Sequence, residues 1–209
     1  MKKIVLVGGG GHCKSVIDSI NSLNSFHIYG IIDIEQNIGK ETCGIKVIDC
    51  DKNLYKYVSI VDYAFITIGS VGNPDLRIKL YNYVKELKFK IPTIIDRTAI
   101  VSEMARIGEG TFVGKGVIIN SDSSIGDNCI VNTGAIIEHD CHIGDNVHIA
   151  PGVTLCGGVN IGSCSHVGAG STVIQYKTLG ERTVIGAASV VVKDIGNDKK
   201  AYGNPCMEV

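Results

Sequence analysis

The sequence predicts a small α/β domain with a parallel sheet, followed by a parallel β-helix, and three features of the second half carry the β-helix prediction. Every sixth residue from Val101 to Val191 is aliphatic, without a miss or an insertion. Four places further on, the residue is usually small or β-branched, as at Cys129 and Cys141, until the break at Lys177. Glycine follows many of the aliphatic residues. A period of six fits neither a helix nor an alternating strand and is typical of a hexapeptide-repeat β-helix.

Each six-residue unit should form one short strand and one turn, and three units should close a triangular coil. The aliphatic side chains would fill the interior, and the following glycine would relieve the backbone at the turn. Stacked coils then bury a continuous core that no single coil could bury. The aliphatic positions, which Ile95 extends upstream, are Val101, Ile107, Val113, Ile119, Ile125, Val131, Ile137, Ile143, Ile149, Leu155, Ile161, Val167, Val173, Leu179, Ile185 and Val191.

The first part of the chain alternates apolar strand patterns with helix patterns, which implies a small parallel sheet. Strands are expected at 3–7, 28–33, 45–48 (at an edge) and 63–68, with 89–95 closing the domain. We place the α/β domain at 1–94 and the β-helix with its tail at 95–209, with almost no linker between them.

Two helices are expected in the α/β domain. The first follows the glycine-rich segment 8–12 and has Val16, Ile17 and Ile20 on one face. The second begins at Asn73-Pro74, an N-cap residue followed by proline in the first turn. Its expected apolar face is formed by Leu76, Leu80, Val84 and Leu87.

The composition excludes several classes of protein. A formal charge of −1 and the lack of a basic cluster argue against nucleic acid as a partner. The apolar run at 4–7 is too short for a signal peptide, and no stretch is long enough to span a membrane. The eight cysteines form no CxxC pair, so we expect them to be reduced and the protein to be cytoplasmic.

A glycine-rich loop, Gly8-Gly9-Gly10-Gly11-His12, follows the first strand and opens the first helix. Backbone N–H groups and the helix dipole favour an anion such as a phosphate at such a place, although a tight turn without a ligand has the same pattern. Cys13 stands where a dinucleotide fingerprint has its third glycine. Asp33, at the end of the second strand, lies where parallel sheets bind ligands and could contact a base or ribose, or be a solvated strand end.

A histidine cluster lies in the β-helix. By the repeat, His139 is expected mid-face and outward, and His148 at a corner half a coil away. The two would then lie on roughly opposite sides of one chain, so a shared reaction needs a second subunit, as in a homotrimer with composite clefts. His166 is one coil beyond His148 and should stack on it at about 4.8 Å.

Acyl transfer from a thioester needs a base that works near neutral pH, and histidine is the natural one. His139 beside Asp140 suits that role because the carboxylate favours the imidazolium and fixes the tautomer. His142 and His166 are expected to be structural, or to line a cleft.

The chain resembles one family over essentially its whole length. The residues that carry the resemblance are Gly8-Gly9-Gly10-Gly11-His12, Ile31-Ile32-Asp33, Ile66-Thr67-Ile68-Gly69, Glu138-His139-Asp140-Cys141 and Gly203-Asn204-Pro205. The family is that of the left-handed β-helix sugar acetyltransferases, which comprises sialic acid O-acetyltransferases and nucleotide-4-amino-sugar N-acetyltransferases. It implies a left-handed β-helix and a homotrimer that uses acetyl-CoA.

The resemblance also implies roles for single residues. His139 would be the general base, tuned by Asp140. His148 would contact the thioester carbonyl, and Ala169 and Ala187 would line the pantetheine arm. Gly10, Gly11, His12, Asp33 and Gly69 would form the nucleotide-sugar pocket. Cys13 replaces a usual glycine, and Ile34 replaces an acidic residue that some amino-sugar enzymes carry. The resemblance therefore does not identify which nucleotide is bound.

The leading hypothesis is therefore N-acetylation of the 4-amine of a nucleotide-linked sugar, for surface glycan biosynthesis, with no metal. O-acetylation of sialic acid or a related sugar is the first alternative. A second is a zinc carbonic anhydrase on the same fold, which needs three neutral histidine ligands around one metal. A non-catalytic scaffold is a further alternative, against which the glycine loop and the histidines both speak.

Overall fold

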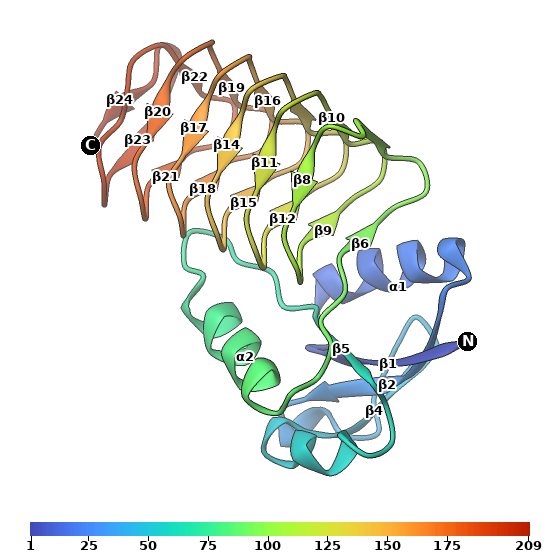
Figure 1. The fold of residues 1–209 in the computed structure, drawn as a ribbon. Coiled ribbons are helices and arrows are strands. Elements are labelled where there is room, and N and C mark those ends of the chain that lie inside the picture. The colour runs from blue at the N-terminus through green and yellow to red at the C-terminus, as the bar shows by residue number, and fades with distance from the viewer.

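The computed structural model describes all 209 residues, as an α/β domain packed against one side of a three-sided parallel β-helix (Figure 1). In the α/β domain, the sheet order is β3-β4-β2-β1-β5, parallel except for the β3–β4 pair. The strands are β1 Lys2–Val7, β2 Phe26–Asp33, β3 Glu41–Thr42, β4 Ile45–Cys50 and β5 Tyr63–Ile66, and the helices are α1 Gly11–Leu23, η1 Glu35–Asn37, η2 Asp51–Tyr57 and α2 Asp75–Glu86. The predicted parallel sheet is confirmed, but β4 is not its edge, because the two-residue β3 covers it.

Helix α1 lies between the sheet and the β-helix (Figure 1). Its buried residues, among them Val16, Ile17 and Ile20, join Ile4 and Leu6 of β1 in one apolar cluster with residues of the first β-helix coils. Those β-helix residues are Ile94, Phe112 and Ile130. Because this cluster contains residues of both domains, the position of the α/β domain is fixed by apolar burial.

Helix α2 covers the other face of the sheet and corrects one prediction. Leu80 and Val84 are buried as expected, but Leu76 is 56% exposed and Arg77 is 1% exposed. The helix begins at Asp75, whose backbone N–H donates to Asn73 Oδ1 at 2.8 Å, in keeping with the predicted capping role of Asn73. The predicted apolar face did not include Arg77. This residue is buried because its guanidinium donates to backbone carbonyls of distant elements, which an apolar pattern does not reveal.

The β-helix has three faces. We name one after its contact with the α/β domain and the other two after their outward side chains. The docking face packs against the α/β domain and contains β6 Ile94–Ile95, β9 Phe112–Val113, β12 Ile130–Val131, β15 His148–Ile149, β18 His166–Val167, β21 Val184–Ile185, β23 Lys200–Tyr202 and β24 Met207–Glu208. The apolar face contains β7 Ile100–Val101, β10 Ile118–Ile119, β13 Ile136–Ile137, β16 Thr154–Leu155, β19 Thr172–Val173 and β22 Val190–Val191. The polar face contains β8 Arg106–Ile107, β11 Ser124–Ile125, β14 His142–Ile143, β17 Asn160–Ile161 and β20 Thr178–Leu179. Since β6 begins at Ile94 and pairs with β9, we take the second domain to begin with this strand.

The repeated aliphatic residues point inward as predicted and form a single core of buried side chains that includes Cys129 and Cys141. The glycine prediction needs correction. Every sixth residue from Gly110 to Ala188 has a positive φ, and these turn residues are not the glycines that follow the aliphatic positions. A Cβ on one of those, Gly162, would lie 2.5 Å from the backbone N of Glu181 in the next coil. Glycine is therefore required at such positions because the stacked coils approach each other too closely for a Cβ.

Candidate active site

One cleft runs between the α/β domain and the docking face. It consists of two adjoining hollows of about 470 and 540 Å³ that share Val71, Asn132 and His148. The first is lined by Gly11, His12, Ser15, Gly69 and Ile130, and the second includes His166, Ala169, Val184 and Ala187. Gly11, His12 and Gly69, which were predicted to hold a nucleotide sugar, thus line a hollow that meets the hollow of Ala169 and Ala187 at His148.

The glycine loop forms the end of this cleft nearest α1. Gly8 has a φ of +107°, and a Cβ there would lie 2.4 Å from Ile68 Cγ1, so no larger residue fits. The Asp33 carboxylate accepts hydrogen bonds from the backbone N–H of Gly9 at 3.0 Å and of Ile34 at 2.7 Å. Asp33 therefore fixes the conformation of the glycine loop through its hydrogen bond to Gly9. Gly10 and Asp33 do not line the cleft in this structure, and their contact with a ligand stays a prediction.

His148 is held in one tautomer. Its Nδ1 lies 2.7 Å from the backbone carbonyl oxygen of Ser70, which can only accept, so Nδ1 carries the proton. Burial lowers the pKa of His148 to about 4, although the bond to Ser70 acts in the opposite direction. Nε2, 3.3 Å from Asn132 Nδ2, is then an acceptor of the Asn132 amide. A neutral ring in this tautomer has no proton on Nε2 to donate to a thioester carbonyl, which argues against donation by His148 itself.

Two further neutral imidazoles flank His148. His166 is its register partner, as the repeat predicts, with ring centroids 4.9 Å apart. Burial lowers the pKa of His12 to about 3, with a smaller contribution from the Arg77 guanidinium, and burial also lowers the pKa of His166. Nε2 of His12 and Nδ1 of His166 are buried and have no partner within the chain. These imidazoles are therefore suited to hydrogen bonding as neutral groups.

His139 and Asp140 lie elsewhere, on the turn between β13 and β14.

 The strand of each unit holds the inward aliphatic residue and the residue before it, which puts His148 in mid-strand and His139 at a corner, the reverse of the prediction. His139 Nδ1 lies 2.7 Å from Asp140 Oδ2, and this hydrogen bond raises the pKa of His139 above its ordinary value. The ring is more than half exposed and lies over Gly157, where a Cβ would come within 2.6 Å of His139 Cε1.

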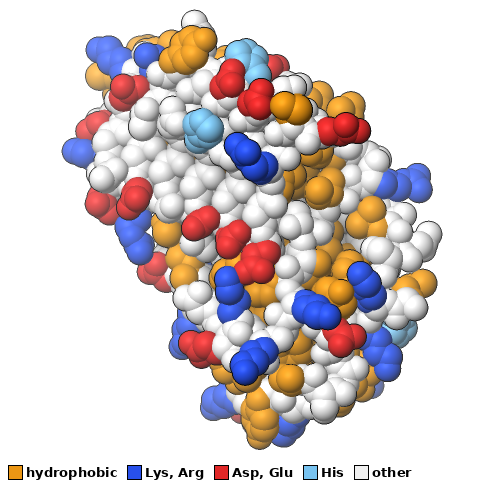
Figure 2. Space-filling view, in the orientation of Figure 1, with side chains coloured by type: hydrophobic (Ala, Val, Ile, Leu, Met, Phe, Trp, Pro, Cys, Tyr) orange, Lys and Arg blue, Asp and Glu red, His pale blue; other side chains and the backbone are white.

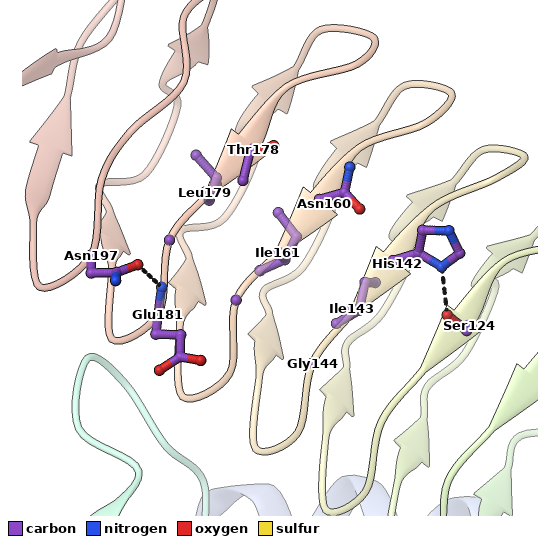
Figure 3. A pocket seen from close by; sticks show the side chains of 12 residues that line it. Ser124, His142, Ile143, Gly144, Asn160, Ile161, Thr178, Leu179, Glu181 and Asn197 are labelled. Carbon is purple, nitrogen blue, oxygen red and sulfur yellow. Dashed lines mark hydrogen bonds between the residues drawn. The ribbon is translucent and has the colours of Figure 1, made fainter.

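The polar face carries a separate, shallow hollow of about 410 Å³ (Figure 3). Ser124 Oγ and His142 Nδ1 lie 2.8 Å apart there, and Asn160 and Thr178 continue the same row of outward side chains. Figure 2 shows the β-helix on this side as a broad band of backbone and uncharged side chains. His142 is exposed and lies on a different face from the cleft, in keeping with the structural role expected for it.

Three site residues were not predicted from the sequence. Asn132 reaches His148, Ser70 fixes its tautomer, and Arg77 donates to the carbonyl oxygens of Ile66 and Ile68 at 2.9 and 2.8 Å, just before Ser70. Asn132 had a signal in the sequence, because it stands where many repeats have glycine. Ser70 and Arg77 had none, since their roles depend on contacts between distant segments.

No group of three or more His, Cys, Asp or Glu side chains is arranged to hold a metal ion. No helix is long and apolar enough to cross a membrane.

Comparison with known proteins defines first the class and then the family. The model of the bacterial transferase hexapeptide (six repeats) matches residues 104–139 and 140–175, and that of the PglD N-terminal domain matches residues 3–84. The class is thus a hexapeptide-repeat transferase with a left-handed β-helix, and the predicted fold is confirmed. No curated protein matches the chain significantly.

Several solved structures are similar to this protein over its full length. A variant of perosamine N-acetyltransferase from Caulobacter crescentus, in complex with CoA and GDP-perosamine, is 35% identical with a TM-score of 0.94, covering 100% of this chain and 97% of that one. The acetyltransferase domain of PglB from Neisseria gonorrhoeae is 30% identical with a TM-score of 0.91, covering 100% of both chains. WeeI from Acinetobacter baumannii, 22% identical with a TM-score of 0.87, covers 100% of both and shares the fold. The chain belongs to the nucleotide amino-sugar N-acetyltransferase family, and the resemblance inferred from its sequence is confirmed.

Proposed function

We propose that the protein transfers an acetyl group from acetyl-CoA to the 4-amine of a nucleotide-linked sugar, in the cytoplasm and for surface glycan biosynthesis. The observation that carries this proposal is the single cleft that joins the glycine loop at His12 to Ala169 and Ala187. The perosamine N-acetyltransferase that is similar over the whole chain was solved with both kinds of ligand, CoA and GDP-perosamine. We infer that the nucleotide lies at the glycine loop and the pantetheine arm along Ala169 and Ala187, so that the two reacting groups meet beside His148.

The general base must come from a neighbouring subunit. His139 does not line the cleft of its own chain. We propose a homotrimer packed through the apolar face, because Ile100 there is 66% exposed and Ile118 and Ile136 are partly exposed in a single chain. In a parallel threefold arrangement, the edge between the apolar and polar faces of one subunit meets the edge between the docking and apolar faces of the next. His139 is on the first edge and Asn132 is on the second.

The side chains then have the following roles. The neutral sugar amine attacks the thioester carbon, and His139 Nε2 takes the amine proton, since Nδ1 donates to Asp140. Negative charge develops on the carbonyl oxygen. Asn132, oriented by its contact with His148 Nε2, donates a hydrogen bond to this oxygen with its other N–H. The intermediate collapses with release of CoA, whose sulfur receives the proton from His139.

The first test is His139→Ala, with thiol release from acetyl-CoA followed in the presence of UDP-, GDP- and CMP-linked amino sugars and of sialic acids. A positioned base contributes about 10²–10⁴-fold, so turnover should fall by this factor. His142→Ala is the matched control, because His142 is also exposed but lies on the polar face, and it should keep full turnover. Unchanged thiol release in His139→Ala would refute the base assignment.

The product and the metal content separate the alternatives. An amide that resists hydroxylamine supports N-acetylation, whereas a labile ester on sialic acid or another sugar would establish O-acetylation. Stoichiometric zinc in the purified protein, with hydration of carbon dioxide and no thiol release, would favour the carbonic anhydrase alternative.

Mixing subunits tests the composite site. His139→Ala and Asn132→Ala should each be inactive as homotrimers. Random mixing of equal amounts of the two variants places an intact His139 beside an intact Asn132 at about one quarter of all interfaces, so activity should return to about that level. Mixed trimers that stay inactive would show that the two residues act from the same chain.

A further inference from the structure

Tyr176 is an exposed aromatic residue in a backbone conformation that disfavours it. It lies on the turn between β19 and β20, with a φ of +57° and 72% of its surface exposed. Of the turn residues that recur every six positions with positive φ, most are Gly, Asn or Asp. A bulky side chain in the left-handed region is unfavourable, and such outliers cluster at ligand sites.

The Tyr176 ring shares its support with the proposed base. The turns that contain His139, Gly157 and Tyr176 stack along one edge of the β-helix, because the N–H of Gly158 donates to the His139 carbonyl at 2.9 Å and the N–H of Tyr176 to the Gly157 carbonyl at 3.0 Å. A Cβ on Gly158 would lie 2.5 Å from Tyr176 Cδ1, and a Cβ on Gly157 would lie 2.6 Å from His139 Cε1. The two rings therefore lean toward adjacent glycines from opposite sides, and neither glycine can bear a side chain without displacing its ring.

The repeat fixes what Tyr176 faces across the subunit boundary. His139 is seven residues after Asn132 (139 − 132), and Tyr176 is seven residues after Ala169 (176 − 169). Every coil has the same 18-residue length here, as the pairing of His148 with His166 shows, so equal offsets mean equal differences in height along the axis. A neighbour that brings its His139 to Asn132 therefore brings its Tyr176 to Ala169.

We infer that Tyr176 is a binding residue for the acyl donor, contributed in trans: its ring covers the pantetheine arm where that arm passes Ala169, next to the base. This inference rests on the proposed function and adds a specificity-determining residue to the same cleft. An aromatic ring suits this place because the second hollow offers mainly small or apolar groups, such as Ala169, Val184 and Ala187, to the ligand. The apolar part of pantetheine would be enclosed between these groups and the ring.

The test is Tyr176→Gly, with CoA affinity measured by titration calorimetry on the intact protein. Glycine relieves the backbone at a positive φ, so the melting temperature should stay the same or rise. The dissociation constant for CoA should rise about tenfold, while that for the nucleotide sugar stays within about twofold. Tyr176→Phe should bind CoA like the wild type, because the ring and not the hydroxyl makes the contact.

Asp198→Gly is the matched control, because Asp198 is also exposed with a φ of +57°, and it should leave CoA binding unchanged. Unchanged CoA affinity in Tyr176→Gly would overturn the inference, and so would loss of the trimer in that variant, which would make Tyr176 an interface residue. The proposed function fails separately, if the wild type binds CoA but acetylates no amino sugar. A wild type that binds no CoA would refute both the inference about Tyr176 and the proposed function.

Discussion

Replacing Arg77 by methionine should destabilise the protein more than any substitution of an exposed charge. The guanidinium is 1% exposed and donates to four backbone carbonyl oxygens, those of Ile66, Ile68, Gly110 and Asn128. The first two belong to the α/β domain and the last two to the β-helix. One buried side chain therefore joins the two domains.

The size of the effect follows from these contacts. A buried acceptor left without a partner costs at least about 1 kcal/mol, which gives about 4 kcal/mol for the four carbonyls. Burial of the charge lowers the pKa of Arg77 to about 10, and relief of this burial offsets part of the loss. We expect a net loss of about 3 kcal/mol, or about 6–12 °C in Tm for a chain of this length.

The assay is thermal unfolding by calorimetry at fixed protein concentration, with nucleotide-sugar affinity as a second measurement. Affinity should fall as well, because Ile68 is two residues before Ser70, which orients His148. Arg182→Met is the control. Arg182 also reaches the other domain, at 3.4 Å from Asp75 Oδ1, but both side chains are more than half exposed, so the change should be within about 0.5 kcal/mol. A Tm of Arg77→Met within about 2 °C of the wild type would refute the reasoning.

Three other predictions concern the histidines and their support. Because Asp140 raises the pKa of His139, and the base must be neutral, activity should rise with pH through a value above the ordinary histidine range; Asp140→Asn should move this limb of the pH–rate profile to lower pH. The pKa values of His12 and His148 are lowered to about 3 and about 4, so the unfolded chain binds more protons below pH 6.5. Stability should therefore fall with acidification from about pH 6.5 to 4, by up to about 1.4 kcal/mol per pH unit for each histidine, and denaturant titrations of His148→Asn should show a shallower fall. Gly157→Ala should lower kcat with little change in Tm, because its Cβ displaces the exposed His139 ring; an unchanged kcat would show that the ring position is not critical.

Much of the fold could be predicted from the sequence because its determinants are local and periodic. The aliphatic residue of each hexad is inward wherever the repeat runs, and the pairing of His148 with His166 follows from counting one coil. The same counting correctly placed His139 and His148 on different sides of the β-helix. It wrongly assigned His139 to a strand and His148 to a corner. His139 with Asp140, and the glycine loop with His12, were found as candidates because each pair is contiguous in the chain.

What the tertiary structure alone decided depends on contacts between distant segments. Arg77 occupies a helix position that the apolar period gives no reason to bury, and its acceptors lie on strand ends and turns of both domains. The tautomer of His148 is set by the Ser70 carbonyl, 78 residues away in the chain. A repeat pattern determines which way a side chain points, because that is a property of the local backbone. It cannot determine which polar group from another segment arrives there, and at a buried site that group decides protonation and therefore chemistry.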